Sequence, residues 1–405
     1  MMKLVIVKLL LFTACFASAN VLHAQIKTGA ENINDYLPLI QGKKIALVVN
    51  NSSRVGNQHL IDTLISLGIK VQKIFTPEHG LKGNVSAGEK VANDVYGKTK
   101  IPVISLYGEK KKPLPSDLNG IELLVFDMQD MGVRFFTYIS TLAYVMEACA
   151  ENAKSLLVLD RPNPHAGYID GPVLKKEFTS FVGLHPVPVV YGMTIGEYAL
   201  MINGEAWLKN QIKCNLKVIK ISNYNHDMKY YPNVPPSPNL RTAEAMLLYP
   251  SLCFFEGTDV SVGRGTDLPF EVVGKPGFMN GNYHFTPVSI PGVADKPLHE
   301  GKKCSGFLLT DFAREFVEPS GQLYLHWLIG FYDSAENKST FFNSFFDKLA
   351  GNNILKQQII EGRQPEEIQK SWENELAEFQ KIRKKYLLYP DFTVKVRSFE
   401  LTPKQ

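Results

Sequence analysis

Short apolar runs alternate with amphipathic segments between residues 44 and 160. Each run is rich in Val, Ile and Leu and is bounded by polar residues or glycine, which is typical of buried strands. The expected strands are Lys44–Asn50, Val71–Phe75, Val103–Leu106, Leu123–Asp127 and Leu156–Asp160. Helical spacing of the apolar residues predicts helices over His59–Leu67 and Tyr138–Asn152. Buried strands that alternate with helices indicate an α/β fold with a parallel sheet covered on both faces.

The pattern changes after residue 190. Thr194–Leu208 is expected to be helical, because Thr194 and Glu197 have the spacing of a capping box. The remaining expected elements are a strand at Leu216–Ile221, a helix at Thr242–Tyr249 that Pro250 ends, a strand at Gly306–Leu309, and helices at Gln322–Phe331 and Pro365–Tyr386. We therefore expect a Rossmann-like parallel-sheet domain over residues 25–244 and a smaller α+β domain over residues 245–405.

The first 24 residues have the order of a secretory signal peptide. Lys3 and Lys8 flank the apolar run Leu4–Phe16, and small residues follow as far as Ala24. We expect cleavage after Ala24 and an exported, periplasmic protein. The residues before Cys15 match a lipid-attachment site poorly, so anchoring there is the less favoured alternative. No later stretch of the sequence is long and apolar enough to predict a transmembrane helix.

Charge and cysteine usage narrow the class of function. The chain carries 44 Lys and Arg against 40 Asp and Glu, so its formal net charge is +4, and no basic surface for nucleic acid is predicted. The four cysteines of the expected mature chain, which are Cys149, Cys214, Cys253 and Cys304, include no close pair. Because zinc ligands normally come in closely spaced pairs, neither these cysteines nor the scattered histidines predict a metal site.

Charged residues gather where the expected strands end. Glu78, Asp127, Asp130, Asp160 and Arg161 all lie at or just after such an end. Ligands of parallel sheets bind at the carboxyl ends of the strands, so this convergence predicts a binding or catalytic site. The segment after the first strand, NNSSRVG, lacks the glycine fingerprint of dinucleotide-binding folds. We therefore expect no nicotinamide or flavin, and no other cofactor.

Two further groups of residues are candidates for chemistry. A Pro-Glu-His-Gly turn places Glu78 beside His79, where a partly buried glutamate could act as a general acid. Glu256, Asp259 and Arg264 lie in a glycine-rich segment, with a glycine on each side of Arg264. A charged hairpin would explain the second group equally well, but bare backbone beside Arg264 would also let a ligand approach.

Several unusual motifs occur in a fixed order within a stretch that runs from about residue 44 to beyond residue 300. They are FTPEHG, DMQDMGVRFFTYISTL, LDRPNP, DGPVL, YGMTIGE, PPSPNL and FFEGTDVSVGRGTDLPFEVVG. Together they resemble the exo-acting β-N-acetylmuramidases of the NamZ type, and the resemblance covers most of the mature chain. It implies a Rossmann-like domain, a smaller C-terminal domain and an active-site cleft between them. It also implies a glycoside hydrolase that removes β-1,4-linked N-acetylmuramic acid (MurNAc) from the non-reducing ends of peptidoglycan fragments.

The resemblance also suggests roles for particular residues. It transfers the proposed catalytic glutamate of the family to Glu78, with His79 beside it, and it matches the segment Gly263-Arg264-Gly265. The second catalytic group is expected to be Asp130, Asp127 or an acid of the 256–271 segment, and the 2-acetamido group of the substrate is an alternative nucleophile. The expected substrate-binding residues are Arg134, Tyr138, Asp160, Asn239, Glu256, Asp259 and Arg264.

MurNAc differs from N-acetylglucosamine (GlcNAc) by a lactyl ether that carries a carboxylate. A guanidinium can form two parallel hydrogen bonds with a carboxylate, so we expect an arginine to bind the lactyl group. Arg264 is the first candidate and Arg134 the second, because Arg134 follows two carboxylates in sequence that could occupy it. Arg161 precedes a proline and is expected to brace its loop.

Two other classes of function remain open at this point. A non-catalytic periplasmic sugar-binding protein would also have two domains, a cleft and many aromatic residues. A metal-dependent hydrolase of the deacetylase type would use Asp and His ligands, and the absence of compact ligand spacing disfavours it.

Overall fold

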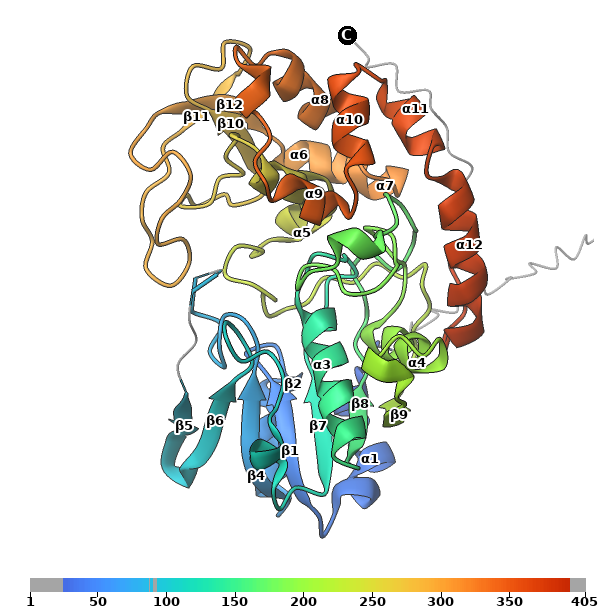
Figure 1. Cartoon of the computed structure of the whole chain (residues 1–405). Helices are drawn as coiled ribbons and strands as arrows, with labels where there is room; N and C mark the ends of the chain where they lie inside the picture. The colour runs from blue at the N-terminus through green and yellow to red at the C-terminus, as the bar shows by residue number, and fades with distance from the viewer. Residues whose placement is uncertain (1–24, 87, 90–92, 394–405) are drawn as a thin grey trace, which may run out of the picture.

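The computed structural model describes residues 25–393 apart from 87 and 90–92, so the expected signal peptide lies outside the described residues. A seven-stranded sheet forms the base of the N-terminal domain, with the order β5-β6-β4-β1-β7-β8-β9 (Figure 1). All neighbouring strands run parallel except the edge pair β5 and β6. The strands are β1 Lys44–Val49, β4 Lys70–Thr76, β5 Asp94–Tyr96, β6 Ile101–Ser105, β7 Leu123–Asp127, β8 Ser155–Leu159 and β9 Asn215–Ile219, and a small hairpin pairs β2 Arg54–Val55 with β3 Gln58–His59.

The expected parallel sheet is confirmed. Each of the first five predicted strands is present within two residues of its predicted bounds. Alternate residues of β1 show why these strands are apolar throughout: Ala46 and Val48 pack into the core on one face, and Ile45, Leu47 and Val49 pack into the core on the other. The sequence pattern missed β5, because this strand is three residues long and largely exposed.

Helices cover the sheet on both faces. They are α1 Ile33–Ile40, α2 Leu60–Ser66, α3 Tyr138–Glu151 and α4 Ile195–Gly204. The capping box predicted for α4 is present, since Thr194 accepts a hydrogen bond from the Glu197 amide and Glu197 accepts one from Thr194. None of the described helices is long and apolar enough to cross a membrane.

The C-terminal part combines a small antiparallel sheet with short helices. The sheet has the order β10-β12-β11, formed by β10 Val272–Lys275, β11 Tyr283–Phe285 and β12 Cys304–Leu308. The helices are α5 Ala243–Leu252, α6 Thr310–Phe312, α7 Glu318–Ser320, α8 His326–Asp333, α9 Phe346–Ala350, α10 Ile354–Ile360, α11 Pro365–Lys370 and α12 Glu373–Arg383. Two predictions need correction: Pro250 lies inside α5 instead of ending it, and the expected long helix is divided between α11 and α12.

The chain returns to the N-terminal domain near its C-terminus. Helix α12, drawn in red in Figure 1, runs back toward α4. The buried Arg383 guanidinium donates to the Gly192 carbonyl and to the Asp391 carboxylate. A few residues later, the Tyr389 hydroxyl donates to the buried carboxylate of Asp160 at 2.6 Å. The last described segment therefore completes the core of the first domain.

The order of the strands determines where a ligand can enter. The chain passes from β1 to β4 and β6 on one side, and then to β7, β8 and β9 on the other. Loops after strands on opposite sides of such a reversal separate and leave a crevice at the carboxyl edge of the sheet. The C-terminal domain lies over this edge (Figure 1).

Candidate active site

A cavity of about 640 Å³ lies between the carboxyl edge of the sheet and the C-terminal domain. The loops after β4, β6 and β7 form one wall, and the segments 256–270 and 293–298 of the C-terminal domain form much of the other. Five of the residues expected from the sequence line it, namely Glu78, His79, Tyr138, Glu256 and Arg264. The structure thus brings acids and an arginine together from segments that are nearly 200 residues apart in the chain.

The carboxylate of Glu78 is held by two hydrogen-bond donors. The Thr137 hydroxyl donates to Oε2 at 2.9 Å, and the Gly88 amide donates to Oε1 at 3.1 Å. The Tyr107 hydroxyl is nearby, and burial together with the neighbouring Glu78 charge holds the pKa of Tyr107 well above its usual range. Tyr107 therefore remains protonated, and Glu78 is fixed in one orientation at the wall of the cavity.

His79 adopts a backbone conformation that is unusual for a residue other than glycine, with φ of 69°. Two hydrogen bonds stabilise it, from Nδ1 to the Val85 carbonyl at 2.7 Å and between Nε2 and the Ser237 hydroxyl at 3.2 Å. Burial lowers the pKa of His79, so its ring is neutral near pH 7. Nδ1 then carries the proton, and Nε2 accepts a hydrogen bond from Ser237.

Arg264 and Glu256 form an ion pair at the cavity, with 2.5 Å between Nε and Oε1. The guanidinium also lies over the Phe270 ring, 5.1 Å from its centroid. Both flanking glycines have positive φ, but the space beside them is filled by the chain itself. A Cβ at Gly263 would lie 2.7 Å from the Leu268 carbonyl oxygen, for example. The expectation that bare backbone admits a ligand here is therefore wrong, and the glycines shape the loop that carries Arg264.

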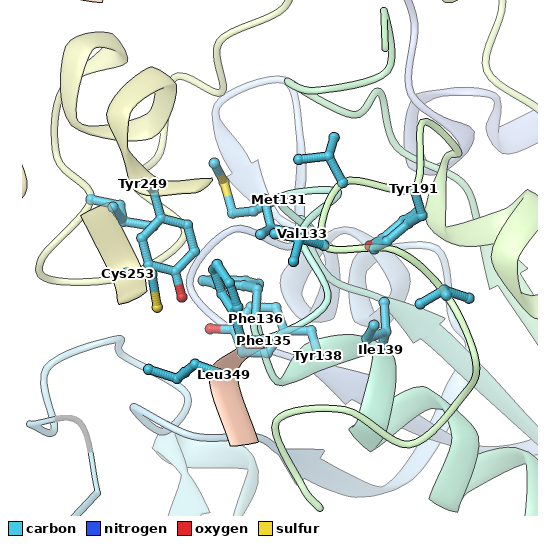
Figure 2. Packing of buried hydrophobic residues seen from close by; sticks show 14 of the residues in the cluster. Met131, Val133, Phe135, Phe136, Tyr138, Ile139, Tyr191, Tyr249, Cys253 and Leu349 are labelled. Carbon is cyan, nitrogen blue, oxygen red and sulfur yellow. The ribbon is translucent and has the colours of Figure 1, made fainter. Parts of the chain in front are cut away.

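Buried aromatic rings line part of the cavity. Figure 2 shows how four of them, Phe135, Phe136, Tyr138 and Tyr249, lie in the hydrophobic cluster. Phe135 and Phe136 follow β7 and pack edge-on against Tyr249 of α5, with ring centroids 5.4 and 6.1 Å apart. Tyr138 lies beside Phe136, and its hydroxyl donates to the Pro236 carbonyl and accepts from Asn50. These contacts join the two domains beneath the site, so the wall that carries Glu78 has a fixed position relative to the wall that carries Arg264.

The expected acids Asp127, Asp130 and Asp160 do not line the cavity, so the prediction that they contact the substrate is corrected. Asp127 is fully buried in an ion pair with Arg161, at 2.5 and 2.9 Å. Asp160 accepts hydrogen bonds from two backbone amides and from the hydroxyls of Thr194 and Tyr389. Asp130 accepts from the Gly132 amide and the Tyr191 hydroxyl. Carboxylates at the ends of these strands therefore stabilise the loops through hydrogen bonds and ion pairs, and their position alone does not identify a catalytic acid.

The buried carboxyl of Asp130 predicts a pH dependence of stability. Burial raises its pKa from 3.8 to about 6, so the folded protein binds this proton more tightly than the unfolded chain. The stabilising contribution is complete below about pH 4 and is lost as pH rises through 6, which amounts to about 2–3 kcal/mol. We expect Asp130→Asn to become more stable relative to wild type between pH 4 and pH 7 in urea unfolding. Parallel stability curves for the two proteins would contradict this assignment.

Arg134 does not line the cavity either, so the prediction that it contacts the substrate is also corrected. Its guanidinium is fully buried and donates to four backbone carbonyls, which are those of Pro172, Val187, Leu349 and Ala350. Burial lowers the pKa of Arg134 to about 9, so the group still carries its charge at neutral pH. It links two loops of the N-terminal domain to the end of α9 and does not reach the cavity.

Asn239 and Asp259 lie near the cavity without lining it. The Asn239 side-chain amide donates to the Val293 carbonyl at 2.9 Å, and its backbone N–H donates to the Ser237 hydroxyl. Asn239 therefore holds the loop that carries Ser237. Asp259 pairs with Lys275 at 2.9 Å on β10. Both residues position neighbouring segments.

The cavity contains residues that sequence reasoning missed. Tyr107 directly follows a predicted strand, so its position could have been noticed. Lys111, Phe181, Glu89, Asp295 and Lys296 come from irregular loops that have no periodic pattern. Across the described ranges, no group of three or more His, Cys, Asp or Glu side chains is arranged to hold a metal ion. The alternative of a metal-dependent hydrolase therefore has no ligand set in this part of the chain.

Comparison with known proteins extends the resemblance seen in the motifs. Residues 45–244 match the family model for the N-terminal domain of the exo-β-N-acetylmuramidase NamZ, and residues 247–389 match the model for its C-terminal domain. The chain is 39% identical over 386 residues to the peptidoglycan β-N-acetylmuramidase NamZ of Bacillus subtilis strain 168, covering 90% of this chain and 92% of the relative.

Two solved structures share the architecture. Both are crystal structures of DUF1343 family proteins from Bacteroides fragilis NCTC 9343. The first is 41% identical with a TM-score of 0.84, covering 91% of this chain and 100% of that one. The second is 28% identical with a TM-score of 0.73, covering 90% and 99%. Since both domains match in order and the identity extends over nine-tenths of the sequence, the chain belongs to the NamZ family of exo-β-N-acetylmuramidases.

Proposed function

We propose that this protein is an exo-acting glycoside hydrolase that removes β-1,4-linked MurNAc from the non-reducing ends of peptidoglycan fragments. The observation that carries the proposal is the placement of Glu78 at the cavity in a chain of this family, held by Thr137 and Gly88. A catalytic carboxyl must be fixed relative to the bond that it cleaves, and these two donors supply that restraint.

Glycosidases mostly use two carboxyl groups and an oxocarbenium-like transition state. Glu78 protonates the glycosidic oxygen as the GlcNAc leaving group departs. Of the acids proposed from the sequence for the second role, Glu256 is the one that lines the cavity. Its ion pair with Arg264 holds it in place at the wall. The substrate 2-acetamido group is the alternative nucleophile, and Glu256 would then orient it.

Arg264 is the residue proposed to bind the lactyl carboxylate. Its Nε bonds to Glu256, while no hydrogen bond occupies its two terminal nitrogens among the described residues. Arg264→Lys keeps the charge but loses the planar fork. Since a hydrogen bond to a charged group contributes about 1.5–3 kcal/mol, we expect kcat/KM for MurNAc substrates to fall about 10- to 100-fold.

The control for Arg264→Lys is a substrate with terminal GlcNAc in place of MurNAc. The kcat/KM for this substrate should be low with the wild type and nearly the same with the variant, because the substrate has no lactyl carboxylate for Arg264 to bind. An equal loss on both substrates would mean that Arg264 serves only to hold Glu256, and the lactyl contact would lie elsewhere.

The place of action is proposed to be the periplasm. The positively charged start, the apolar run Leu4–Phe16 and the small residues ending at Ala24 support export with cleavage of the leader. A peptidoglycan-derived substrate agrees with this location. Fractionation of cells that produce the full chain, with N-terminal sequencing of the product, tests both the compartment and the cleavage site.

One assay separates the three classes of function considered from the sequence. Purified protein is incubated with MurNAc–GlcNAc disaccharide, with and without a chelator. Release of MurNAc in both conditions supports the proposal. Binding without release would support a sugar-binding protein, and activity abolished by the chelator would support a metal-dependent hydrolase.

A further inference from the structure

The two ends of the cavity differ in exposure. At one end, Arg264 lies over Phe270, and Tyr249 and Phe135 close the wall with rings that are almost fully buried. At the other end, Tyr107, Lys111 and Phe181 are only half-buried. An exo-acting enzyme encloses the terminal sugar and lets the rest of the polymer extend outward. The end at Arg264 therefore suits the terminal MurNAc, and the end at Phe181 suits the remainder of the chain.

Glu78 lies between these two ends. Its carboxylate lies near Tyr107, whose ring lies 5.9 Å from that of Phe181. On the other side, Glu78 accepts from Thr137, and the adjacent Phe136 packs against Tyr249. Tyr249 in turn packs against Phe270, the ring beneath Arg264. A bond broken at Glu78 would thus have its terminal sugar on the Arg264 side and its leaving group on the Phe181 side.

Three consecutive lysines at the open end have different partners: the outer two pair with carboxylates, and the middle one pairs with none among the described residues. Lys110 pairs with Asp117 at 2.6 Å, and Lys112 pairs with Glu147 and Glu151. Lys111 between them turns to the cavity, with Nζ 4.8 Å from the centroid of Phe181, and has no carboxylate partner in the described parts of the chain. Tyr144 of α3 stacks on the Phe181 ring at 6.2 Å, which fixes its orientation.

We propose that Phe181 and Lys111 form the subsite for the leaving part of the glycan. This inference rests on the proposed function. Phe181 carries the apolar face of the released GlcNAc, as aromatic rings do for flat, partly apolar ligands. Lys111 pairs with the first carboxylate beyond the cleaved bond, which in an alternating GlcNAc–MurNAc chain is the lactyl group of the next MurNAc.

Three substrates of increasing length test the subsite. They are the β-glycosyl fluoride of MurNAc, the MurNAc–GlcNAc disaccharide and the tetrasaccharide with two such repeats. Phe181→Ala should lower kcat/KM for the disaccharide about 2- to 10-fold and change that for the fluoride less, because fluoride is too small to contact the ring. Phe181→Tyr keeps the ring and should keep the preference for the disaccharide.

Lys111→Met should lower kcat/KM more for the tetrasaccharide than for the disaccharide, by about 2- to 5-fold, and the difference should vanish at high salt. Lys110→Met and Lys112→Met are matched controls, because both lysines pair with acids outside the cavity. The inference is overturned if Phe181→Ala affects fluoride and disaccharide alike, or if all three lysine variants behave alike. If the wild type releases MurNAc from none of the substrates, the proposed function itself fails.

Discussion

Replacing Glu78 with Gln is expected to lower kcat on MurNAc–GlcNAc by about 10²–10⁴-fold, which is the usual contribution of a general acid. Gln keeps the shape: its side-chain oxygen can still accept from the Gly88 amide, and its NH2 group can donate to the Thr137 hydroxyl oxygen, so the fold and substrate binding should persist. The proton that the leaving GlcNAc needs is no longer available. Steady-state kinetics and the melting temperature of the same preparation give the two readouts.

A second substrate shows which role Glu78 has. An aryl glycoside of MurNAc with an acidic phenol leaves without a proton, so Glu78→Gln should be impaired much less on it than on the disaccharide. Glu89→Gln is a suitable control, because Glu89 lines the same cavity. If Glu78→Gln retained activity within a factor of two of wild type on the disaccharide, Glu78 would not be the catalytic acid.

Arg134→Met is expected to lower the free energy of unfolding by about 3–5 kcal/mol. The buried guanidinium is the donor for four backbone carbonyls that belong to both domains. Each buried acceptor left without a donor costs about 1–3 kcal/mol. Arg134→Lys should rescue little, because an ammonium has three donors and lacks the planar fork.

Differential scanning calorimetry of the Arg134 variants gives the measurement. The control is Arg314→Met, because Arg314 makes a surface ion pair with Glu244, and such pairs contribute at most about 1 kcal/mol. Equal, small shifts in melting temperature for both variants would show that solvent or neighbouring donors replace the Arg134 hydrogen bonds.

Much of the N-terminal sheet was predictable because each strand is apolar on both faces. Leu123–Asp127 has the predicted bounds of β7, and Tyr138–Glu151 forms α3 one residue shorter than expected. The failures have local causes. Pro250 is buried within α5, so tertiary packing outweighs its local preference. Helices α11 and α12 separate near the buried Trp372, which a polar charge pattern does not reveal.

The site was predictable only in part. A position at the end of an expected strand identified Glu78, which lines the cavity. The same criterion also selected Asp127, Asp130 and Asp160, which a single sequence cannot distinguish from catalytic acids. Burial separates them, and burial depends on contacts between distant segments. Phe181 illustrates the limit, because it lies in an irregular loop and lines the cavity while its ring packs against Tyr107 and Tyr144.

The return of the chain to its first domain has a consequence for the order of synthesis. Asp160 is buried beside Glu197, and their final hydrogen-bond donors are the Tyr389 hydroxyl and the Leu388 amide. A ribosome makes these two donors more than 180 residues after Glu197. Until then each carboxylate lacks one of its native donors, although Thr194 already bonds to both. A buried acceptor without its full set of donors is unfavourable. We therefore expect a fragment that stops at residue 244 to be less stable than the same domain in the full chain.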